Sequence, residues 1–345
     1  MPKETRNPNL EPQPDAAASD FGVRPSFGFW NSTFGFFHRH FREISVAAAL
    51  VVLLLSLAVA APAFYQPQPL LSLLTRESPA LVVSCGMALV IIGRQIDISV
   101  GSQFAVCGVC AGLLAAMNLP FVLVLPASVV LGASMGALNG MLVAGLRLPS
   151  IVVTLATMVA WREGLRWLRQ GQFVNLPDGV QWFGLSQTTG QRALIFAALV
   201  LLVLMAFALK HVAAGRFVYA VGSDAEAARL AGIRPQRVTF TTFVLLGAFV
   251  GLAAMMNVVQ SPQVDPNSGA GLELKAIAAV VVGGVAISGG RGSLWGVFVG
   301  LLLLSCVNPA LTHLRVEAYW EKAIQGAVIL VAVVADGLRK RKERN

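Results

Sequence analysis

The segment Phe121–Ala144 reads FVLVLPASVVLGASMGALNGMLVA and contains no charged side chain. An α-helix rises about 1.5 Å per residue, so a run of this length can cross the roughly 30 Å hydrocarbon core of a bilayer. Its glycine and serine residues suit a membrane helix, because small side chains let neighbouring helices approach closely. The segment therefore predicts a transmembrane helix and an all-α membrane protein.

The composition of the whole chain agrees with this interpretation. Hydrophobic residues make up 56% of the 345 residues and charged residues only 12%, and the mean hydropathy is +0.71. Soluble domains carry about 25% charged residues, so a soluble protein is excluded. The second and eighth of ten predicted spans are short for a straight crossing, so we expect broken, tilted or partly re-entrant helices there. The ten spans are Ile44–Phe64, Ala80–Ile92, Ile98–Met117, Phe121–Ala144, Ser150–Leu168, Ala193–Leu209, Val238–Val259, Leu272–Ile287, Leu294–Ala310 and Tyr319–Ala335.

The distribution of lysine and arginine predicts the orientation of these spans. With both termini in the cytoplasm, 18 of the 26 basic residues lie on the cytoplasmic side, as the positive-inside rule requires. The net charge of +9 is then a consequence of topology. Nucleic-acid binding is disfavoured, because no basic face with interleaved aromatic residues exists outside the lipid-flanking positions.

Three regions follow from the spans. Residues 1–43 form a disordered or interfacial cytoplasmic tail without a cleavable signal pattern. Residues 44–338 form the transmembrane domain, with a cytoplasmic loop at about 211–237, and residues 339–345 form a basic cytoplasmic tail. Two interpretations of the aromatic stretch Phe21–Phe41 remain open: a segment lying in the membrane interface, or a leader without function.

A short polar helix is predicted in the middle loop, at Ser223–Gly232 (SDAEAARLAG). Ser223 can cap its N-terminus, and Glu226 three residues later completes a capping box. Asp224 and Glu226 face the positive end of the helix dipole, and Gly232 provides the stop. A polar helix with defined ends between two apolar segments predicts a surface that a partner contacts. An ordinary amphipathic surface helix is the alternative.

The chain lacks an energy source of its own. It has no Gly-x-x-x-x-Gly-Lys-Ser/Thr phosphate loop, and Gly289–Ser293 is interpreted as a tight connection between helices, because it has no lysine and no preceding soluble strand. An intramembrane carboxylate such as Asp97 or Glu273 could carry a proton or a sodium ion. Both lie near span ends, where capping is the commoner role. A separate chain therefore becomes the expected energy source.

No catalytic or metal site is predicted. Cys85, Cys107, Cys110 and Cys306 all lie within spans. Cys107 and Cys110 have a metal-like spacing but no second pair and no nearby histidine, so they are interpreted as small packing residues. The absence of a nucleophile with its base disfavours a membrane enzyme.

Four blocks of sequence follow one another along the chain. They are Ile96–Ser102, Leu148–Thr157, Gly215–Gly222 leading into the Ser223 helix, and Gly271–Ala279 followed by Gly283, Gly284 and Ser288–Ser293. Together they resemble the permease subunits of ribose-type bacterial ABC importers. The resemblance extends from about residue 43 to Asp336, and an ordered set of four blocks is far more specific than one motif.

The resemblance implies the fold and the partners. It implies a fold akin to the cobalamin importer, in the bacterial inner membrane. It implies a second permease subunit, identical or paralogous, a cytoplasmic ATPase and a periplasmic sugar-binding protein. ATP and Mg would bind the ATPase, and this chain would hold no cofactor. The run through Leu176-Pro177 and Gln181–Ser186 is most similar to rhamnose or autoinducer-type members, so the expected solute is rhamnose or a related deoxyhexose or pentose.

Candidate site residues fall into three groups. The residues expected to couple to the ATPase are Ser223, Asp224, Glu226, Ala227, Ala228, Arg229, Leu230 and Gly232. The candidates for the translocation pathway are Asp97, Ser99, Ser102, Asn139, Thr154, Thr157 and Glu273. The small residues expected to pack helices are Gly132, Gly136, Gly140, Gly292, Gly296 and Gly300.

Each group keeps an alternative. Asp97 with Ser99 and Ser102 could break a helix and line a cavity, or form a structural cap buried in protein. The hydroxyls of Thr154 and Thr157 could touch sugar, or bond their own i−4 carbonyls. The glycine faces could meet a second permease or pack within the subunit. At the level of function, the alternative is an ion-coupled secondary carrier that uses Asp97 or Glu273.

Overall fold

The structure is a computed structural model that describes residues 45–59 and 61–313, with scattered positions between 317 and 334. The chain divides into two compact units, residues 1–41 and 42–345, and all described residues belong to the second. The predicted tails at 1–43 and 339–345 and most of the predicted span Tyr319–Ala335 lie outside the described residues. Those expectations therefore stay predictions.

The described part is helical except for one pair of two-residue strands. A first helix, Ser45–Val59, precedes the labelled elements. These are η1 (Pro62–Tyr65), α2 (Pro67–Ile92), α3 (Val100–Ala116), α4 (Phe121–Gly140), the π-helix η2 (Met141–Gly145), α5 (Ser150–Arg169), β1 (Val174–Asn175), η3 (Gln181–Gly184), α6 (Gln187–His211), α7 (Ala213–Ser223), α8 (Ala225–Leu230), α9 (Pro235–Val258), β2 (Gln263–Val264), α10 (Leu272–Val282), α11 (Leu294–Ser305) and α12 (Val307–His313).

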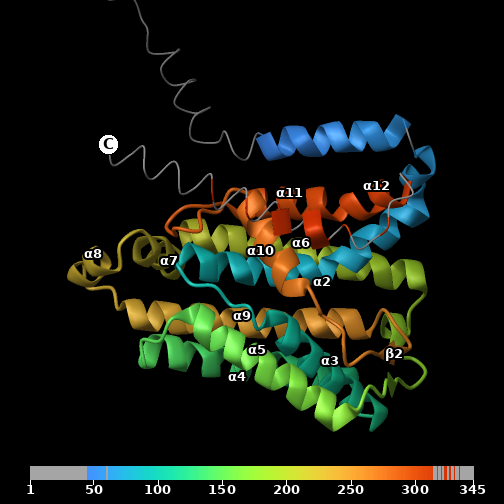
Figure 1. Cartoon of the computed structure of the whole chain (residues 1–345). Helices are drawn as coiled ribbons and strands as arrows, with labels where there is room; N and C mark the ends of the chain where they lie inside the picture. Colours follow the sequence, from blue (N-terminus) through green and yellow to red (C-terminus); the bar gives the residue numbers. More distant parts are fainter. Residues whose placement is uncertain are drawn as a thin grey trace, which may run out of the picture. The chain divides into compact units, whose positions relative to one another are not determined.

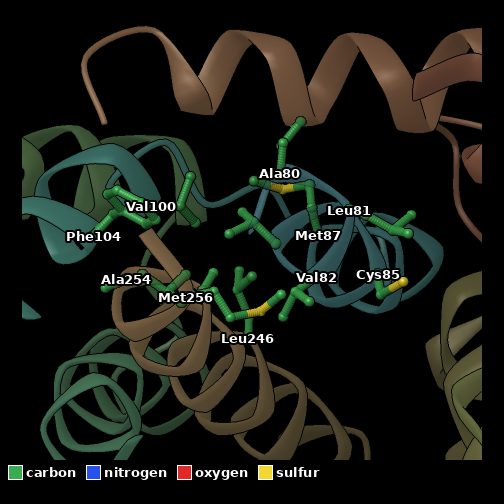
Figure 2. Packing of buried hydrophobic residues seen from close by; sticks show 14 of the residues in the cluster. Ala80, Leu81, Val82, Cys85, Met87, Val100, Phe104, Leu246, Ala254 and Met256 are labelled. Atoms are coloured by element: carbon green, nitrogen blue, oxygen red, sulfur yellow. The ribbon is translucent and has the colours of Figure 1, made fainter. Parts of the chain in front are cut away.

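Helix α9 is the centre of the packing. It has its most extensive contact with α4 and also contacts α2 and α3, while α2 contacts α6, α10 and α11. Figure 1 shows α2 and α9 running side by side, with α8 at one end of the helices and β2 at the opposite end. The core between them is apolar: Figure 2 shows Met87 of α2, Phe104 of α3 and Leu246 of α9 in one buried cluster.

The second span is neither short nor broken, so this part of the expectation is wrong, and a tilted or partly re-entrant course stays a prediction. Helix α2 continues without a break from Pro67 to Ile92, with Pro79 inside it. Proline removes one helical N–H, which frees the carbonyl four residues earlier. That carbonyl belongs to Thr75, and Gln260 Nε2 lies 3.4 Å from it. The hydroxyls of Thr75 and Ser78 donate to the i−4 carbonyls of Leu71 and Leu74. These hydrogen bonds satisfy both polar side chains within the helix.

The eighth predicted span is short in the structure too. Helix α10 has 11 residues and ends at Val282. The segment that follows it connects α10 to α11, and Gly289, Gly290 and Gly292 in this connection have positive φ. This confirms the interpretation of Gly289–Ser293 as a tight connection between helices.

Five described helices are long and apolar enough to cross a membrane, and two shorter apolar helices accompany them. Helix α5 coincides with the predicted span Ser150–Leu168 but is not among the seven, because it carries charged residues such as Arg162 and Glu163. A multi-pass membrane protein is thus supported, and the total of ten crossings stays a prediction. The five long helices are Pro67–Ile92, Phe121–Gly145, Gln187–His211, Pro235–Val258 and Leu294–Thr312, and the shorter two are Ser45–Val59 and Val100–Ala116.

Both glycine faces pack against helices of this same chain. A Cβ on Gly132 would collide with the Gly247 carbonyl of α9, and one on Gly136 would collide with the Phe243 carbonyl. A Cβ on Gly140 would lie 3.1 Å from the Phe240 carbonyl oxygen. The glycines of α11 meet α10 in the same way: a Cβ on Gly300 would lie 2.5 Å from the Ala279 carbonyl oxygen, and Gly296 lies against Gly283. Gly292 precedes α11 and lies against Val285.

A small antiparallel strand pair closes the end opposite α8. Val174 of β1 pairs with Val264 of β2, and both side chains are buried. Two residues are too few to show the alternating pattern of a strand, so this pair cannot be predicted from the sequence.

Candidate functional site

The break between α2 and α3 holds a buried polar cluster. The Asp97 carboxylate, 0% exposed, accepts hydrogen bonds from the Ser99 backbone N–H (2.8 Å) and from the Ser99 hydroxyl (2.5 Å). Its second oxygen lies 3.3 Å from both Gln103 Nε2 and Asn139 Nδ2. The break therefore brings together Asp97, Ser99 and Asn139, three pathway candidates, and ties α3 to α4. The Ser102 hydroxyl turns back to the Ser99 carbonyl at 2.8 Å.

Two amide oxygens of this cluster have no partner. Gln103 Oε1 and Asn139 Oδ1 are buried and accept no hydrogen bond, although their NH₂ groups point to Asp97 and Ser99. Gln103 was not predicted as a site residue. It lies six residues after Asp97, across the helix start, and only the broken backbone brings the two side chains together.

The two threonines of α5 have different surroundings. Thr154 is buried and lies against the break: its hydroxyl accepts from the Ile98 N–H at 3.1 Å and donates to the Ser150 carbonyl at 2.9 Å. Thr157 is half-buried, and its hydroxyl lies 3.1 Å from the Val153 carbonyl, four residues earlier. Both hydroxyls thus engage i−4 carbonyls, and Thr154 also supports the backbone of the break.

Glu273 lies apart from the Asp97 cluster, against the first turn of α3. A Cβ on Gly101 would collide with Glu273 Oε2 and lie 3.2 Å from Arg162 Nη2. Both of those atoms are buried and have no hydrogen-bond partner. The other carboxylate oxygen, Oε1, accepts from the Gly271 N–H at 3.2 Å. The site therefore brings opposite charges from α5 and α10 to the same point on α3, at more than ion-pair distance.

A second charged pair was missed from the sequence. Lys275 Nζ of α10 lies 2.9 Å from Glu77 Oε1 and 2.7 Å from Oε2 of α2, and the Glu77 side chain is only 7% exposed. The predicted second span begins at Ala80, which places Glu77 outside the membrane helix. The signal that could have found it is the apolar run Leu70–Leu74, which extends the helix upstream of Pro79.

Helix α8 confirms a short polar helix in the middle loop, but its cap differs from the prediction. Asp224, not Ser223, is the N-cap: its Oδ1 accepts from the N–H groups of Glu226 (2.9 Å) and Ala227 (3.0 Å). Ser223 is the last residue of α7, and Glu226 pairs with Arg229 instead of closing a capping box. Asp224 caps α8 because α7 extends through Ser223. Asp224 is thus the residue with extended backbone between the two helices.

The cap changes the acidity of Asp224. The N–H groups of Ala227 and Glu226 hold the pKa of this carboxyl below its usual range, and the Arg94 guanidinium acts in the same direction. The C-terminal end matches the expectation that Gly232 stops the helix. Gly232 has φ +84° and donates to the Arg229 carbonyl, and Ile233 donates to the Ala228 carbonyl, as in a Schellman motif.

The apolar residues of α8 that we expect to couple to the ATPase are only partly exposed. Ala228 is buried at 5% exposure against its own chain, so it is unavailable to a partner. Leu230 is 80% exposed, and Ala227 is exposed beside it. The large apolar side chain that this helix exposes is therefore Leu230.

The end of α7, which leads into α8, lies against the end of α2. A Cβ on Gly222 of α7 would collide with the Ile92 carbonyl, and the Gly290 N–H donates to that same carbonyl at 2.9 Å. Arg94, the second residue after α2, donates from Nε to the Ser288 carbonyl at 2.7 Å. The end of α2, which leads into Asp97, thus contacts the helix that precedes α8.

Residues 70–333 match a family described as branched-chain amino acid transport system / permease component. The ribose import permease protein RbsC of Escherichia coli (strain K12) is 31% identical over 85% of this chain and 92% of its own. The autoinducer 2 import system permease protein LsrC of Enterobacter sp. (strain 638) is 34% identical over 86% of this chain and 87% of its own. LsrC of Salmonella typhi is 34% identical over 88% of each chain. No solved structure matches the chain.

Proposed function

This chain belongs to the family of branched-chain amino acid transport permease components, and from that membership we propose that it is the membrane-spanning subunit of an ABC importer for a small sugar. It is a multi-pass membrane protein, and we place both of its termini in the cytoplasm of a bacterium. The energy comes from a separate ATPase that binds ATP and Mg, since this chain has no phosphate loop.

The observation that carries this proposal is the geometry of α8. A helix capped at both ends holds one exposed leucine, and the preceding helix, α7, contacts the end of α2 through the backbone of Gly222. Apolar anchors at the centre of an interface supply most of its binding energy, whereas exposed ion pairs such as Glu226–Arg229 fix the register. Leu230 is thus the proposed anchor in a groove of the ATPase.

The route from α8 to the interior is short. Closure of the ATPase would displace α8, and the contact of Gly222 with Ile92 would pass that displacement to α2. The next residues after α2 lead to Asp97, whose carboxylate fixes α3 and α4. This continuous set of contacts supports alternating access driven from the cytoplasmic loop, with the Asp97 cluster as the hinge.

The proposed solute is a neutral sugar, with rhamnose or a related deoxyhexose or pentose as the specific choice. The names of the relatives specify ribose and autoinducer 2. The segment that resembles rhamnose and autoinducer-type members forms η3, and Phe183 of η3 lines a cavity of about 390 Å³ with Pro177 and Phe121. A second permease subunit and a periplasmic sugar-binding protein complete the proposed assembly.

The proposal is tested with Leu230→Glu. A buried carboxylate in an apolar groove is strongly unfavourable, so this variant should lose co-purification with the ATPase and ATP-dependent sugar uptake. Membrane insertion and thermal stability should stay at the wild-type level, because Leu230 is exposed.

Two control variants separate docking from general damage. Leu230→Met keeps an apolar anchor and should retain the ATPase. Leu185→Glu places the same charge on another exposed leucine, 52% exposed, beside η3, and should also retain it. Normal co-purification of the ATPase with Leu230→Glu would show that α8 is a solvated connector.

A further inference from the structure

A polar cavity between α2, α3, α9 and α10 is not explained by the coupling mechanism. Its volume is about 470 Å³, within the roughly 300–1,000 Å³ of small-molecule sites. Two of its apolar lining residues, Ala80 of α2 and Phe104 of α3, are labelled in Figure 2. The cavity is also lined by Glu77, Lys275 and Asn257, so its wall combines an aromatic ring with charged and amide groups.

The Glu77–Lys275 pair has unused hydrogen-bonding capacity. A lysine ammonium carries three N–H donors and a carboxylate about four acceptor positions. The pair with Lys275, together with the longer 3.7 Å approach of Arg76 Nε to Glu77 Oε1, uses only part of both. Glu77 Oε2 is buried and accepts no hydrogen bond of good geometry, although Lys275 Nζ lies 2.7 Å away. Side chains that are 7% and 17% exposed cannot satisfy that capacity with bulk water.

The Asn257 amide adds a neutral donor and acceptor. Asn257 is half-buried on α9, and among the residues that the structure describes it has no hydrogen-bond partner for its side chain. A polar group that lines a cavity in this state is available to a ligand.

We propose that this cavity binds a neutral, monosaccharide-sized polyol during its passage. A sugar hydroxyl donates one hydrogen bond and accepts others, so neighbouring hydroxyls match a carboxylate, an ammonium group and an amide placed side by side. The two buried charges compensate each other, which favours a neutral ligand over an ion. The other cations at the cavity, Arg76 and Lys322, are exposed, so solvent screens their charges.

This inference rests on the proposed import function, because it names the solute site of the importer. The test needs no ATPase. The detergent-purified full chain is heated with increasing D-ribose, L-rhamnose or the anion D-galacturonate, and the unfolding midpoint is measured. A ligand that binds only the folded state raises this midpoint with concentration. At least one of the two neutral sugars should raise it, and D-galacturonate should have a smaller effect.

The decisive variant is the double substitution Glu77→Gln/Lys275→Met. Replacing both members of a buried ion pair by uncharged side chains of similar size is often tolerated, so the protein should fold. Its affinity for the sugar should fall about tenfold or more, since hydrogen bonds to charged groups are lost. Asn257→Leu, which leaves the ion pair intact, should weaken the sugar shift independently.

The matched control is Glu163→Gln/Arg166→Met, which removes an exposed ion pair on α5 with an N–O distance of 2.7 Å. This variant should keep the full sugar shift. The proposal is overturned if neither neutral sugar shifts the wild-type midpoint, if the Glu77/Lys275 double variant keeps the shift, or if D-galacturonate shifts it most. A sugar shift that persists while the ATPase fails to bind would contradict the import function and leave the cavity assignment intact.

Discussion

At the scale of the residue, Asp97 carries the break between α2 and α3. Four donor groups converge on a carboxylate that is 0% exposed, and no basic side chain is among its hydrogen-bond partners. Asp97→Leu leaves these donors buried without an acceptor, at about 1–3 kcal/mol each. We expect this variant to lose several kcal/mol of unfolding free energy and its transport.

Asp97→Asn is the informative partner variant. The asparagine keeps one acceptor, and its NH₂ can donate to Gln103 Oε1 or Asn139 Oδ1 if those amides rotate, because both oxygens have no partner now. Substantial uptake and a loss of only about 1–2 kcal/mol are expected, measured by thermal unfolding and sugar uptake. Equal, complete loss of uptake in both variants would argue for an obligatory charge, as an ion-coupled carrier requires.

Gly101 is a position in α3 where a side chain has no room. In Gly101→Ala the new Cβ collides with Glu273 Oε2 and with the Gly269 carbonyl, so we expect a loss of about 1–3 kcal/mol. Gly164→Ala is the control on α5, where no atom lies within 4 Å of the new Cβ. It should be neutral or stabilising by up to about 1 kcal/mol. If the thermal unfolding midpoints of Gly101→Ala and Gly164→Ala fall by the same amount, the close contact at Gly101 is contradicted.

At the scale of the element, α8 depends on its aspartate cap. A folded-state pKa below the unfolded value means that the cap is fully formed above the unfolded pKa, and is lost as the pH falls through the folded pKa. Hydrogen-exchange protection of the Glu226 and Ala227 amides should therefore stay constant from neutral pH down to about pH 4 and fall only below it.

Two variants check this assignment. Asp224→Asn keeps a capping oxygen without a titrating group, so its amide protection should lose the acid transition. Ser223→Ala should leave protection as in the wild type, because Ser223 belongs to α7. If amide protection depends on Ser223 instead, then Ser223 is the N-cap, as expected from the sequence.

The lengths of the apolar runs predicted the positions of most helices. Where this prediction failed, polar contacts between side chains were the reason. The predicted span Ala193–Leu209 lies inside α6, which adds polar residues at both ends. The start of α2 was misplaced, because Glu77 and Pro79 end an apolar window while the structure satisfies them through Lys275 and Gln260. The partners of Asp97 come from Gln103 and from Asn139, 42 residues away, and hydropathy contains no information about such pairing.

At the scale of the whole molecule, the positive-inside rule predicts that α8 faces the cytoplasm and the η3 end faces outward. The native cysteines are buried or half-buried, so single engineered cysteines can be labelled above a low background. Ala227→Cys should be protected from an impermeant maleimide in intact cells and labelled in inverted membranes. Asp178→Cys, between β1 and η3, should show the reverse. The opposite result would invert the topology and remove the ATPase from α8.

The glycine contact between α4 and α9 has a consequence for biogenesis. Gly132 and Gly136 meet backbone of α9, yet Pro235 leaves the ribosome about a hundred residues after α4. During that interval α4 sits in the bilayer with its most extensive partner still unmade, so its glycine stripe can meet only lipid or an insertion chaperone. Chains arrested before α9 should therefore be captured by membrane quality control, and completion of α9 marks the moment at which the nascent protein escapes degradation.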